Sequence, residues 1–328
     1  MTSPPDSAPL ENAAAAETAV PAVPAVQAAP RRRRRWLWPL LLLAGLFAVL
    51  WIPVVRPHAR DAVTHWHALA AEHDLLQNDL DAARDSAEQA VAWAAKRLPN
   101  GDFNAALEKP ESALAEAPLL GVALRLRAEI SLARGDLERS LADYNTLVQF
   151  NPHLARAYRG RAAVLQRLGR HREAIDDTTR FVDLRTAGDA DALNARAYTR
   201  AIANLELEEA LLDAERALAG LPKRPLELGD TINAVNILDT RGYVRYLLGD
   251  YRPALADMDE ALRAFEAVWE QLQQPSVAPR MKQELQHSLA VMHQHRGLIH
   301  EKLGNAAASQ ADLQRAQELG YDPAKGVY

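Results

Sequence analysis

A helix-turn-helix phrase recurs along this chain at a nearly fixed spacing. In two copies, ISLARGDLERSLADYNTLVQFNP and AVLQRLGRHREAIDDTTRFVDL, Gly135 and Gly169 lie 34 residues apart, and Asp143 and Asp177 keep the same offset. A period of roughly 20–50 residues indicates an array in which each unit buries its apolar face only against its neighbours. This repetition constrains the fold more strongly than any single residue does.

Further copies of the phrase are less regular. RGYVRYLLGDYRPALADMDEAL begins at Arg241, YTRAIANLELEEALLDAERALAGLP at Tyr198 and HQHRGLIHEKLGNAAASQADLQRAQELGYDP at His293. A degenerate copy, HALAAEHDLLQNDLDAARDSAEQAV, begins at His67. The strongest units are predicted at about 121–154, 155–188, 191–222, 235–268 and 290–323, with degenerate units within 64–120.

Residues 98–120 have two interpretations. Asn100-Gly101-Asp102 provides a turn and Pro118 ends the stretch in register with the next unit, which favours a damaged half-repeat. Pro110 would kink or split the helix between them. An ordinary long loop with one helical turn is the alternative.

Small side chains occupy the places where the two helices of each unit are expected to cross. A short side chain lets the ridges of one helix pack closely onto the other. In the first helices these residues are Ala71, Ala128, Ala162, Gly242 and Gly297, with Tyr198 interrupting the series, and in the second helices they are Ala83, Ser140, Ala174, Ala210, Ala254 and Ser309. Pro152, Pro222 and Pro323 stand where a helix must stop, since proline lacks the backbone donor.

With this pattern the chain resembles the tetratricopeptide repeat family over roughly residues 64–323. The resemblance implies an all-α solenoid with essentially no sheet. It also implies a concave groove, lined by the first helices of successive units, that holds a peptide or a partner helix. No cofactor is implied.

The residues before the repeats differ in composition. Residues 1–35 are Pro/Ala-rich without aromatic side chains and end in five arginines, Arg31 to Arg35, so we expect a disordered tail. Trp36 to Val55 is a run of 20 residues without a charge. A helix of that length spans about 30 Å, the thickness of a bilayer's hydrocarbon core. The sequence therefore predicts a single transmembrane helix over 36–55, followed by the repeat domain over 56–328.

The arginine run predicts the orientation of this span. Positive charge is retained on the cytoplasmic side, which would leave the repeats on the opposite face. Arginine outnumbers lysine about five to one, which is typical of a GC-rich bacterial genome. We therefore expect a bacterial inner membrane, with a cytoplasmic N-terminus and periplasmic repeats. A cleaved signal peptide and a nucleic-acid-binding arginine patch are the alternatives; we expect no nucleic-acid partner.

Catalytic motifs are missing from the sequence. It has no cysteine, no phosphate loop, no G-x-S-x-G and no H-E-x-x-H. His293, His295 and His300 lack the i, i+4 spacing of helical metal ligands, so we expect them to be solvated or at the groove edge. Acidic pairs such as Asp176-Asp177 and Glu208-Glu209 are expected on wetted second-helix faces. We predict no enzyme, no metal and no cofactor, although an enzyme with an unrecognised site remains an alternative.

The resemblance also places residues in the groove, unit by unit. The predicted inward-facing residues are Val122, Arg125 and Glu129; Arg156, Arg159, Ala163 and Gln166; Ala192, Ala195, Thr199 and Ile202; and Asn236, Asp239, Tyr243 and Tyr246. Arg125, Arg156, Arg159 and Arg167 form a candidate basic patch for carboxylates; Tyr243 and Tyr246 form a candidate aromatic patch. Solvated surface arginines are the alternative. The clamp with which some family members hold a C-terminal carboxylate is not reproduced, because Glu129 and Gly160, or Ala163 and Arg196, occupy its asparagine places.

These observations favour a non-enzymatic, membrane-tethered scaffold that holds a peptide or protein in envelope, secretion or assembly processes. The alternative is an accessory subunit of an envelope enzyme or transport complex, with its groove permanently occupied.

Overall fold

The computed structural model describes residues 55–98, 117–222 and 228–322. Across these ranges the chain forms α-helices and no strand, and the helices all belong to one contact unit, Ile52–Tyr328. The helices form side-by-side pairs joined by short turns. In chain order the pairs are α2 (Val55–Leu76) with α3 (Leu80–Ala95), α6 (Leu120–Arg134) with α7 (Leu137–Phe150), α8 (Ala155–Arg167) with α9 (His171–Asp183), α10 (Ala190–Ala203) with α11 (Leu207–Gly220), α12 (Leu228–Leu248) with α13 (Tyr251–Leu272), and α14 (Pro279–Lys302) with α15 (Ala306–Glu318).

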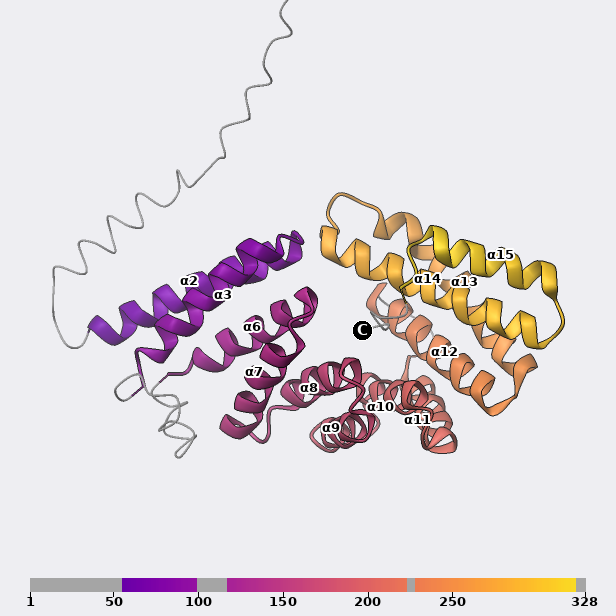
Figure 1. The fold of residues 1–328 in the computed structure, drawn as a ribbon, viewed down its shortest axis with the longest axis horizontal. Coiled ribbons are helices and arrows are strands. Elements are labelled where there is room, and N and C mark those ends of the chain that lie inside the picture. Colours follow the sequence, from indigo (N-terminus) through magenta and orange to yellow (C-terminus); the bar gives the residue numbers. More distant parts are fainter. Residues whose placement is uncertain (1–54, 99–116, 223–227, 323–328) are drawn as a thin grey trace, which may run out of the picture. The chain divides into compact units, whose positions relative to one another are not determined.

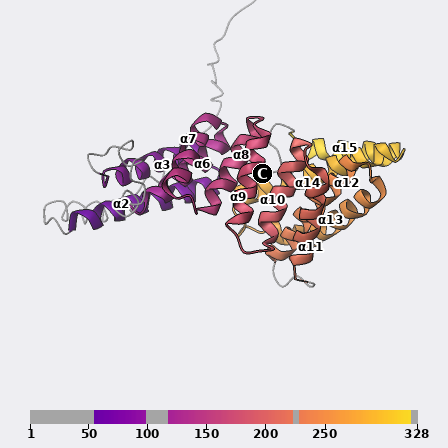
Figure 2. The same ribbon diagram turned by 90° about the horizontal axis from the view of Figure 1, so that it is seen from below.

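Neighbouring pairs pack on one another in sequence order (Figures 1 and 2). The first helices contact each other in succession, α6 with α8, α8 with α10, α10 with α12 and α12 with α14. Each second helix also contacts the first helix of the next pair, as α7 contacts α8 and α9 contacts α10. Pairs covered by their neighbours are typical of a tetratricopeptide solenoid. The predicted all-helical repeat fold is confirmed for the described residues.

The predicted helix crossings are close-packed. All the small residues assigned to the second helices are buried, and Ala71, Ala128 and Ala162 are buried in the first helices. At one crossing the hydroxyl of Ser140 donates a hydrogen bond of 2.8 Å to the carbonyl oxygen of Ala128. A larger residue at either place would separate the helices, because the backbones themselves come close.

The pair of α10 with α11 corrects one assignment. Ala197, rather than Tyr198, is the small residue at its crossing, where it packs fully buried in one cluster with Ala210. The left-handed residue that ends the first helix is Asn204, with φ of 52°. It follows Ala197 by seven residues, the same interval that separates the small residue from the left-handed residue in the other pairs, where that residue is Asn78 in the first pair and a glycine in the rest. Asparagine tolerates this conformation, so the missing glycine at this turn does not break the repeat.

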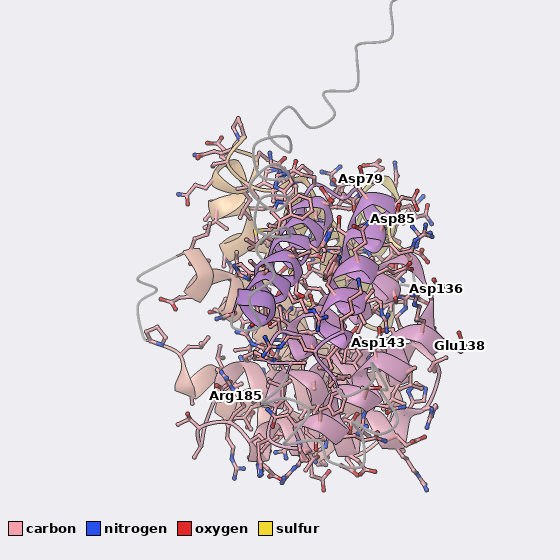
Figure 3. The ribbon with its side chains drawn as sticks, turned by 90° about the vertical axis from the view of Figure 1, so that its left-hand side faces the viewer. Asp79, Asp85, Asp136, Glu138, Asp143 and Arg185 are labelled. Atoms are coloured by element: carbon pink, nitrogen blue, oxygen red, sulfur yellow. The ribbon has the colours of Figure 1, made fainter. Side chains whose placement is uncertain are left out.

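A paired arginine and aspartate join the two helices in five pairs. The arginine of the first helix donates two parallel hydrogen bonds to a buried aspartate of the second helix. The pairs are Arg127–Asp143, Arg161–Asp177, Arg196–Asp213, Arg241–Asp257 and Arg296–Asp312. In Figure 3 Asp143 lies among the helices, whereas Asp136 and Glu138, both exposed, lie toward the edge of the ribbon.

Asp177 therefore corrects a second expectation. It is only 5% exposed, so it does not lie on a wetted face with its neighbour Asp176, which is exposed. The physical reason is the guanidinium of Arg161, whose Nε and Nη2 lie 2.7 Å from the two carboxylate oxygens. A buried carboxylate is tolerated when its oxygens are satisfied in this way. Glu208 and Glu209 are exposed, as predicted.

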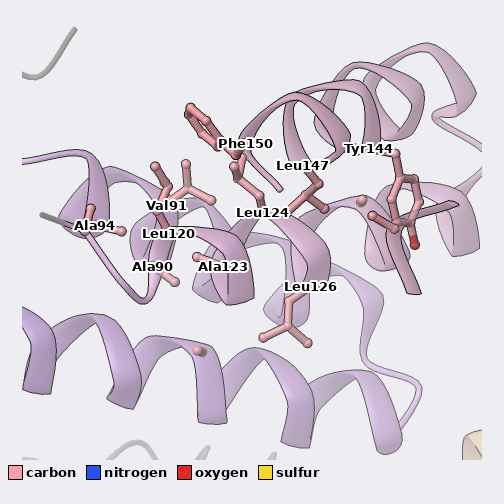
Figure 4. Packing of buried hydrophobic residues seen from close by; sticks show 14 of the residues in the cluster. Ala90, Val91, Ala94, Leu120, Ala123, Leu124, Leu126, Tyr144, Leu147 and Phe150 are labelled. Carbon is pink, nitrogen blue, oxygen red and sulfur yellow. The ribbon is translucent and has the colours of Figure 1, made fainter. Parts of the chain in front are cut away.

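Apolar clusters fill the space between pairs. Figure 4 shows the cluster formed by α3, α6 and α7, in which Val91, Leu120, Leu124 and Phe150 are buried. At the other end of the array α13 runs on to Leu272, and its last turns pack against Leu285 and Leu289 of α14.

Several predictions lie outside the described residues. These are the predicted tail over 1–35, the predicted transmembrane span as far as Val54, and most of the predicted half-repeat over 98–120. Pro323 also lies outside the described residues. Val55, the last residue of the predicted span, is the first residue of α2. Among the helices described, none is both long and apolar enough to cross a membrane.

Candidate functional site

The first helices share one face because they contact one another in succession. The sequence-predicted groove residues all lie on these helices, so their surroundings decide what the face can bind. Second helices cover the opposite side of each pair. The face formed by α6, α8, α10 and α12 is therefore the candidate binding surface.

Three of the four predicted groove arginines have acceptors within the chain. Arg125 Nη1 lies 2.6 Å from Glu129 Oε1, Arg159 Nη1 lies 2.9 Å from Asp191 Oδ2, and Arg167 Nη1 donates to the carbonyl oxygen of Leu132 at 2.8 Å. Arg156 is exposed and has no ion pair with any described residue. The positive charge available to an acidic partner is therefore smaller than four arginines imply, and Arg156 carries most of it.

The two tyrosines of the predicted aromatic patch stack in a row with a histidine of α14. Tyr243 stacks on His295, with ring centroids 4.2 Å apart, and on Tyr246 at 6.1 Å. His295 Nδ1 lies 2.8 Å from Asp239 Oδ1, and this pair, buried, links α14 to α12. Burial raises the pKa of Tyr243. Tyr243 and Tyr246 are both partly exposed, so each can offer a ring edge to a partner while the stack holds its position.

The histidines of α14 differ from expectation. His295 is 7% exposed and bonded to Asp239, and His293 Nδ1 lies 2.9 Å from Asp312 Oδ1. They are thus partly or fully buried partners of carboxylates, not solvated side chains, because α14 packs against both α12 and α15. Within the described ranges no group of three or more histidine, aspartate and glutamate side chains is arranged to hold a metal ion.

A small pocket opens between the first helices of the second, third and fourth strong units. Its volume is about 130 Å³. We call it the Asn194 pocket, and its lining residues are Arg159, Ala162, Ala163 and Gln166 of α8, Thr178 of α9, Asp191, Asn194, Ala195, Tyr198 and Thr199 of α10, and Asn233, Asn236 and Ile237 of α12.

The Asn194 pocket contains some predicted groove residues and several that were missed. The predicted groove residues that line it are Arg159, Ala163, Gln166, Ala195, Thr199 and Asn236. Ala192, also predicted, is fully buried and does not line it. Asp191, Asn194 and Tyr198 lie outside the prediction because the predicted register of α10 is one residue too far along the chain. The interval from Ala197 to the left-handed Asn204 is the signal that would have corrected the frame.

Asn194 is the most unusual side chain in this pocket. It is 7% exposed, and its Oδ1 is buried without a hydrogen-bond partner among the described residues. Leaving a buried polar atom unpaired costs about 1–3 kcal/mol. Such an atom in a pocket wall is a reason to expect a ligand there.

A larger hollow of about 570 Å³ lies on α14 and α15, lined by residues that include Ser309, Gln310, Gln314 and Gln317. Within the part of the chain that the structure describes, it holds no buried side-chain atom that lacks a hydrogen-bond partner. The Asn194 pocket is therefore the better candidate site.

Comparisons with known proteins concern the fold. A scan against protein-family models gives no match, and a search of curated proteins gives none either. Among solved structures, a tetratricopeptide repeat protein from Parabacteroides merdae ATCC 43184 is 18% identical, covering 81% of this chain and 97% of its own, with a TM-score of 0.46. MamA from Desulfovibrio magneticus RS-1 is 14% identical, covering 61% of this chain and 94% of its own, with a TM-score of 0.41.

YrrB, a TPR protein with an unusual peptide-binding site, is 19% identical, covering 67% of this chain and 97% of its own, with a TM-score of 0.35. These likenesses are too distant to carry an argument about function. We assign the described helices to the tetratricopeptide-type solenoids on their own packing: paired helices, small residues at the crossings and a left-handed turn residue seven positions later.

Proposed function

We propose that this chain is a non-enzymatic scaffold that holds a peptide or a partner protein on the face formed by its first helices. The observation that carries the proposal is the Asn194 pocket, a recess on this face with a buried and unpaired acceptor in its wall. Solenoids of this type commonly use the surface lined by equivalent helices for binding. Arg156, exposed on α8, adds a cation beside the same face.

The location of the scaffold is also part of the proposal. The uncharged run from Trp36 to Val55 would tether it to a bacterial inner membrane, and the arginines before this run would keep the N-terminus in the cytoplasm. The repeats would then lie in the periplasm and take part in envelope, secretion or assembly processes. A tether raises the effective concentration of a held partner at the membrane surface.

Site-specific photocrosslinking of the full chain in its native membrane tests the scaffold. A photoreactive residue at Ala163, in the pocket wall, should give a discrete protein adduct, whereas the same residue at the exposed Glu209 of α11 should not. Adducts of equal yield and identity at both positions would contradict use of the first-helix face.

Charge reversal provides the second arm of this experiment. Arg156→Glu should lower the Ala163 adduct several-fold if the partner is acidic, because it removes an exposed guanidinium without breaking an internal ion pair. Arg172→Glu, at an exposed position of the second helix α9, is the matched control and should leave the adduct unchanged. An adduct unaffected by Arg156→Glu would count against the basic patch but not against the face.

A further inference from the structure

Three side-chain oxygens in the wall of the Asn194 pocket, those of Thr178, Asn194 and Thr199, are available only as hydrogen-bond acceptors. Thr199 Oγ1 donates its proton to the Ala195 carbonyl at 2.8 Å, and Thr178 Oγ1 lies 3.0 Å from the Ile175 carbonyl. Each hydroxyl therefore keeps only acceptor lone pairs for a ligand. Asn194 Oδ1 is a third acceptor, and it is unpaired. A group that pairs with these three oxygens must bring N–H or O–H donors.

The charge of the pocket excludes a cation. Its lining residues that are charged near neutral pH are Arg159 and Asp191, and these neutralise each other across 2.9 Å. A buried ammonium or guanidinium would therefore lack a carboxylate of its own, and an unpaired buried charge is strongly unfavourable. The donor group must be neutral.

The volume of the pocket and its apolar lining residues further restrict the chemical group that it can bind. Ligand pockets for free small molecules usually measure about 300–1,000 Å³, whereas this pocket measures about 130 Å³. It suits one side chain of a larger partner. Ala162, Ala163, Ala195 and Ile237 offer apolar contact for methylene groups. A main-chain amide brings a single N–H and bulky flanking atoms, whereas a primary carboxamide brings two N–H donors on a narrow stem.

We propose that the Asn194 pocket is a recognition subsite for the primary carboxamide of an asparagine or glutamine side chain in the bound polypeptide. Its NH₂ group would donate to Asn194 Oδ1 and to a threonine oxygen, and Arg159 or Gln166 at the pocket wall would donate to its carbonyl. This inference rests on the proposed function, whose partner surface it refines.

Ligand-observed saturation-transfer NMR on the full chain in detergent micelles tests the subsite with four small probes at millimolar concentration. The probes are acetamide, N-methylacetamide, acetate and methylammonium, which differ in donor number, bulk and charge. We expect acetamide to show a saturation transfer at least fivefold greater than the other three. An equal response to N-methylacetamide or to acetate would overturn the proposal, because the site would then not distinguish a primary carboxamide.

Variants connect the response to Asn194. Asn194→Leu should reduce the acetamide response at least fivefold, and Asn194→Asp, which keeps acceptors but adds a negative charge, should shift the preference toward methylammonium. Gln271→Leu, which removes an exposed carboxamide of α13 outside the pocket, is the matched control and should change nothing. An acetamide response that survives in both Asn194 variants, with no shift toward methylammonium, would refute the subsite.

The NMR experiment and the crosslinking experiment distinguish failure of the subsite from failure of the scaffold. Loss of acetamide selectivity while the Ala163 crosslink persists would remove the subsite and leave the partner face in place. Acetamide selectivity without a crosslink at Ala163 would support the subsite and contradict the scaffold.

Discussion

Gly242 of α12 lies where this helix crosses α13. A Cβ atom at this position would come within 2.8 Å of Met258 Cε and 3.2 Å of the Ala254 carbonyl oxygen. The carbonyl belongs to the backbone and cannot move aside without shifting α13. We expect Gly242→Leu to lower the free energy of unfolding by about 2 kcal/mol, the usual size of overpacking, which circular dichroism would register as a lower thermal midpoint.

Gly229, in the same helix, provides the control for Gly242. A Cβ atom there meets no heavy atom within 4 Å. Because leucine favours a helix over glycine by about 0.8 kcal/mol, Gly229→Leu should leave the thermal midpoint unchanged or raise it. Equal losses in the two variants would mean that the crossing of α12 and α13 is not close-packed.

The carboxylate of Asp177 tests whether the arginine–aspartate pairs hold the helix pairs together. Its side chain is 8% exposed and its partner Arg161 is 21% exposed, so solvent screens the pair only weakly. Asp177→Asn leaves the Arg161 guanidinium partly buried without a counter-charge. Breaking a buried pair from one side costs about 3–5 kcal/mol, and we expect a loss near the lower limit, measured by chemical denaturation.

The adjacent residue supplies a control of identical chemistry. Asp176 is exposed, and Asp176→Asn should change the free energy of unfolding by less than about 0.5 kcal/mol. If Asp176→Asn and Asp177→Asn had the same effect, the general charge of α9, not the buried pair, would be responsible.

At the scale of the element, the turn between α10 and α11 shows why a sequence can predict a repeat and still misplace its residues. Asn204 and Glu206 both have positive φ, and one extra residue separates the turn from α11 compared with the other pairs. Arg196 and Asp213 accordingly lie 17 residues apart, whereas the other arginine–aspartate pairs lie 16 apart. Either Ala197 or Tyr198 could occupy the crossing by sequence spacing alone, and only the backbone of the turn decides between them.

The last pair, α14 with α15, contains an aspartate that makes its stability depend on pH. Burial acts to raise the pKa of Asp312, but hydrogen bonds from His293 and Arg296 outweigh it and hold the pKa at about 2, below the ordinary 3.8. A carboxyl with a depressed pKa stabilises the fold above the pKa of the unfolded chain and loses that contribution as pH falls through the folded value. The contribution is about 2 kcal/mol, and it disappears between about pH 4 and pH 2.

Asp312→Asn isolates this contribution. The difference in free energy of unfolding between the native chain and the variant should be greatest near neutral pH and should shrink as pH falls from about 4 toward 2. Denaturant titrations at a series of pH values measure it. A difference that stays constant over that interval would show that Asp312 does not titrate as its contacts with His293 and Arg296 imply.

At the scale of the whole molecule, periodicity was sufficient to predict the solenoid but not its chemistry. Glycine and alanine spacing determines which residues cross, because a helix pair tolerates only small side chains there. The pairing of Arg161 with Asp177 could have been found from their recurrence 34 residues after Arg127 and Asp143. The unpaired oxygen of Asn194 could not have been predicted in this way. It depends on how three helices of separate units, α8, α10 and α12, enclose this one side chain.

The charge distribution predicts how the whole chain is oriented in a membrane. Because the chain has no cysteine, a single introduced cysteine can report this orientation. A single cysteine can be introduced as Ser3→Cys in the tail or as Gln310→Cys at an exposed position of α15. In cells whose outer membrane is permeabilised, a membrane-impermeant maleimide should label Gln310→Cys but not Ser3→Cys until the inner membrane is disrupted. The positive-inside rule predicts that Arg31 to Arg35 set this orientation, so replacing all five with glutamate should allow labelling of Ser3→Cys in a substantial fraction of chains. Labelling of both positions in the unmodified arginine background would contradict a single-pass anchor with periplasmic repeats.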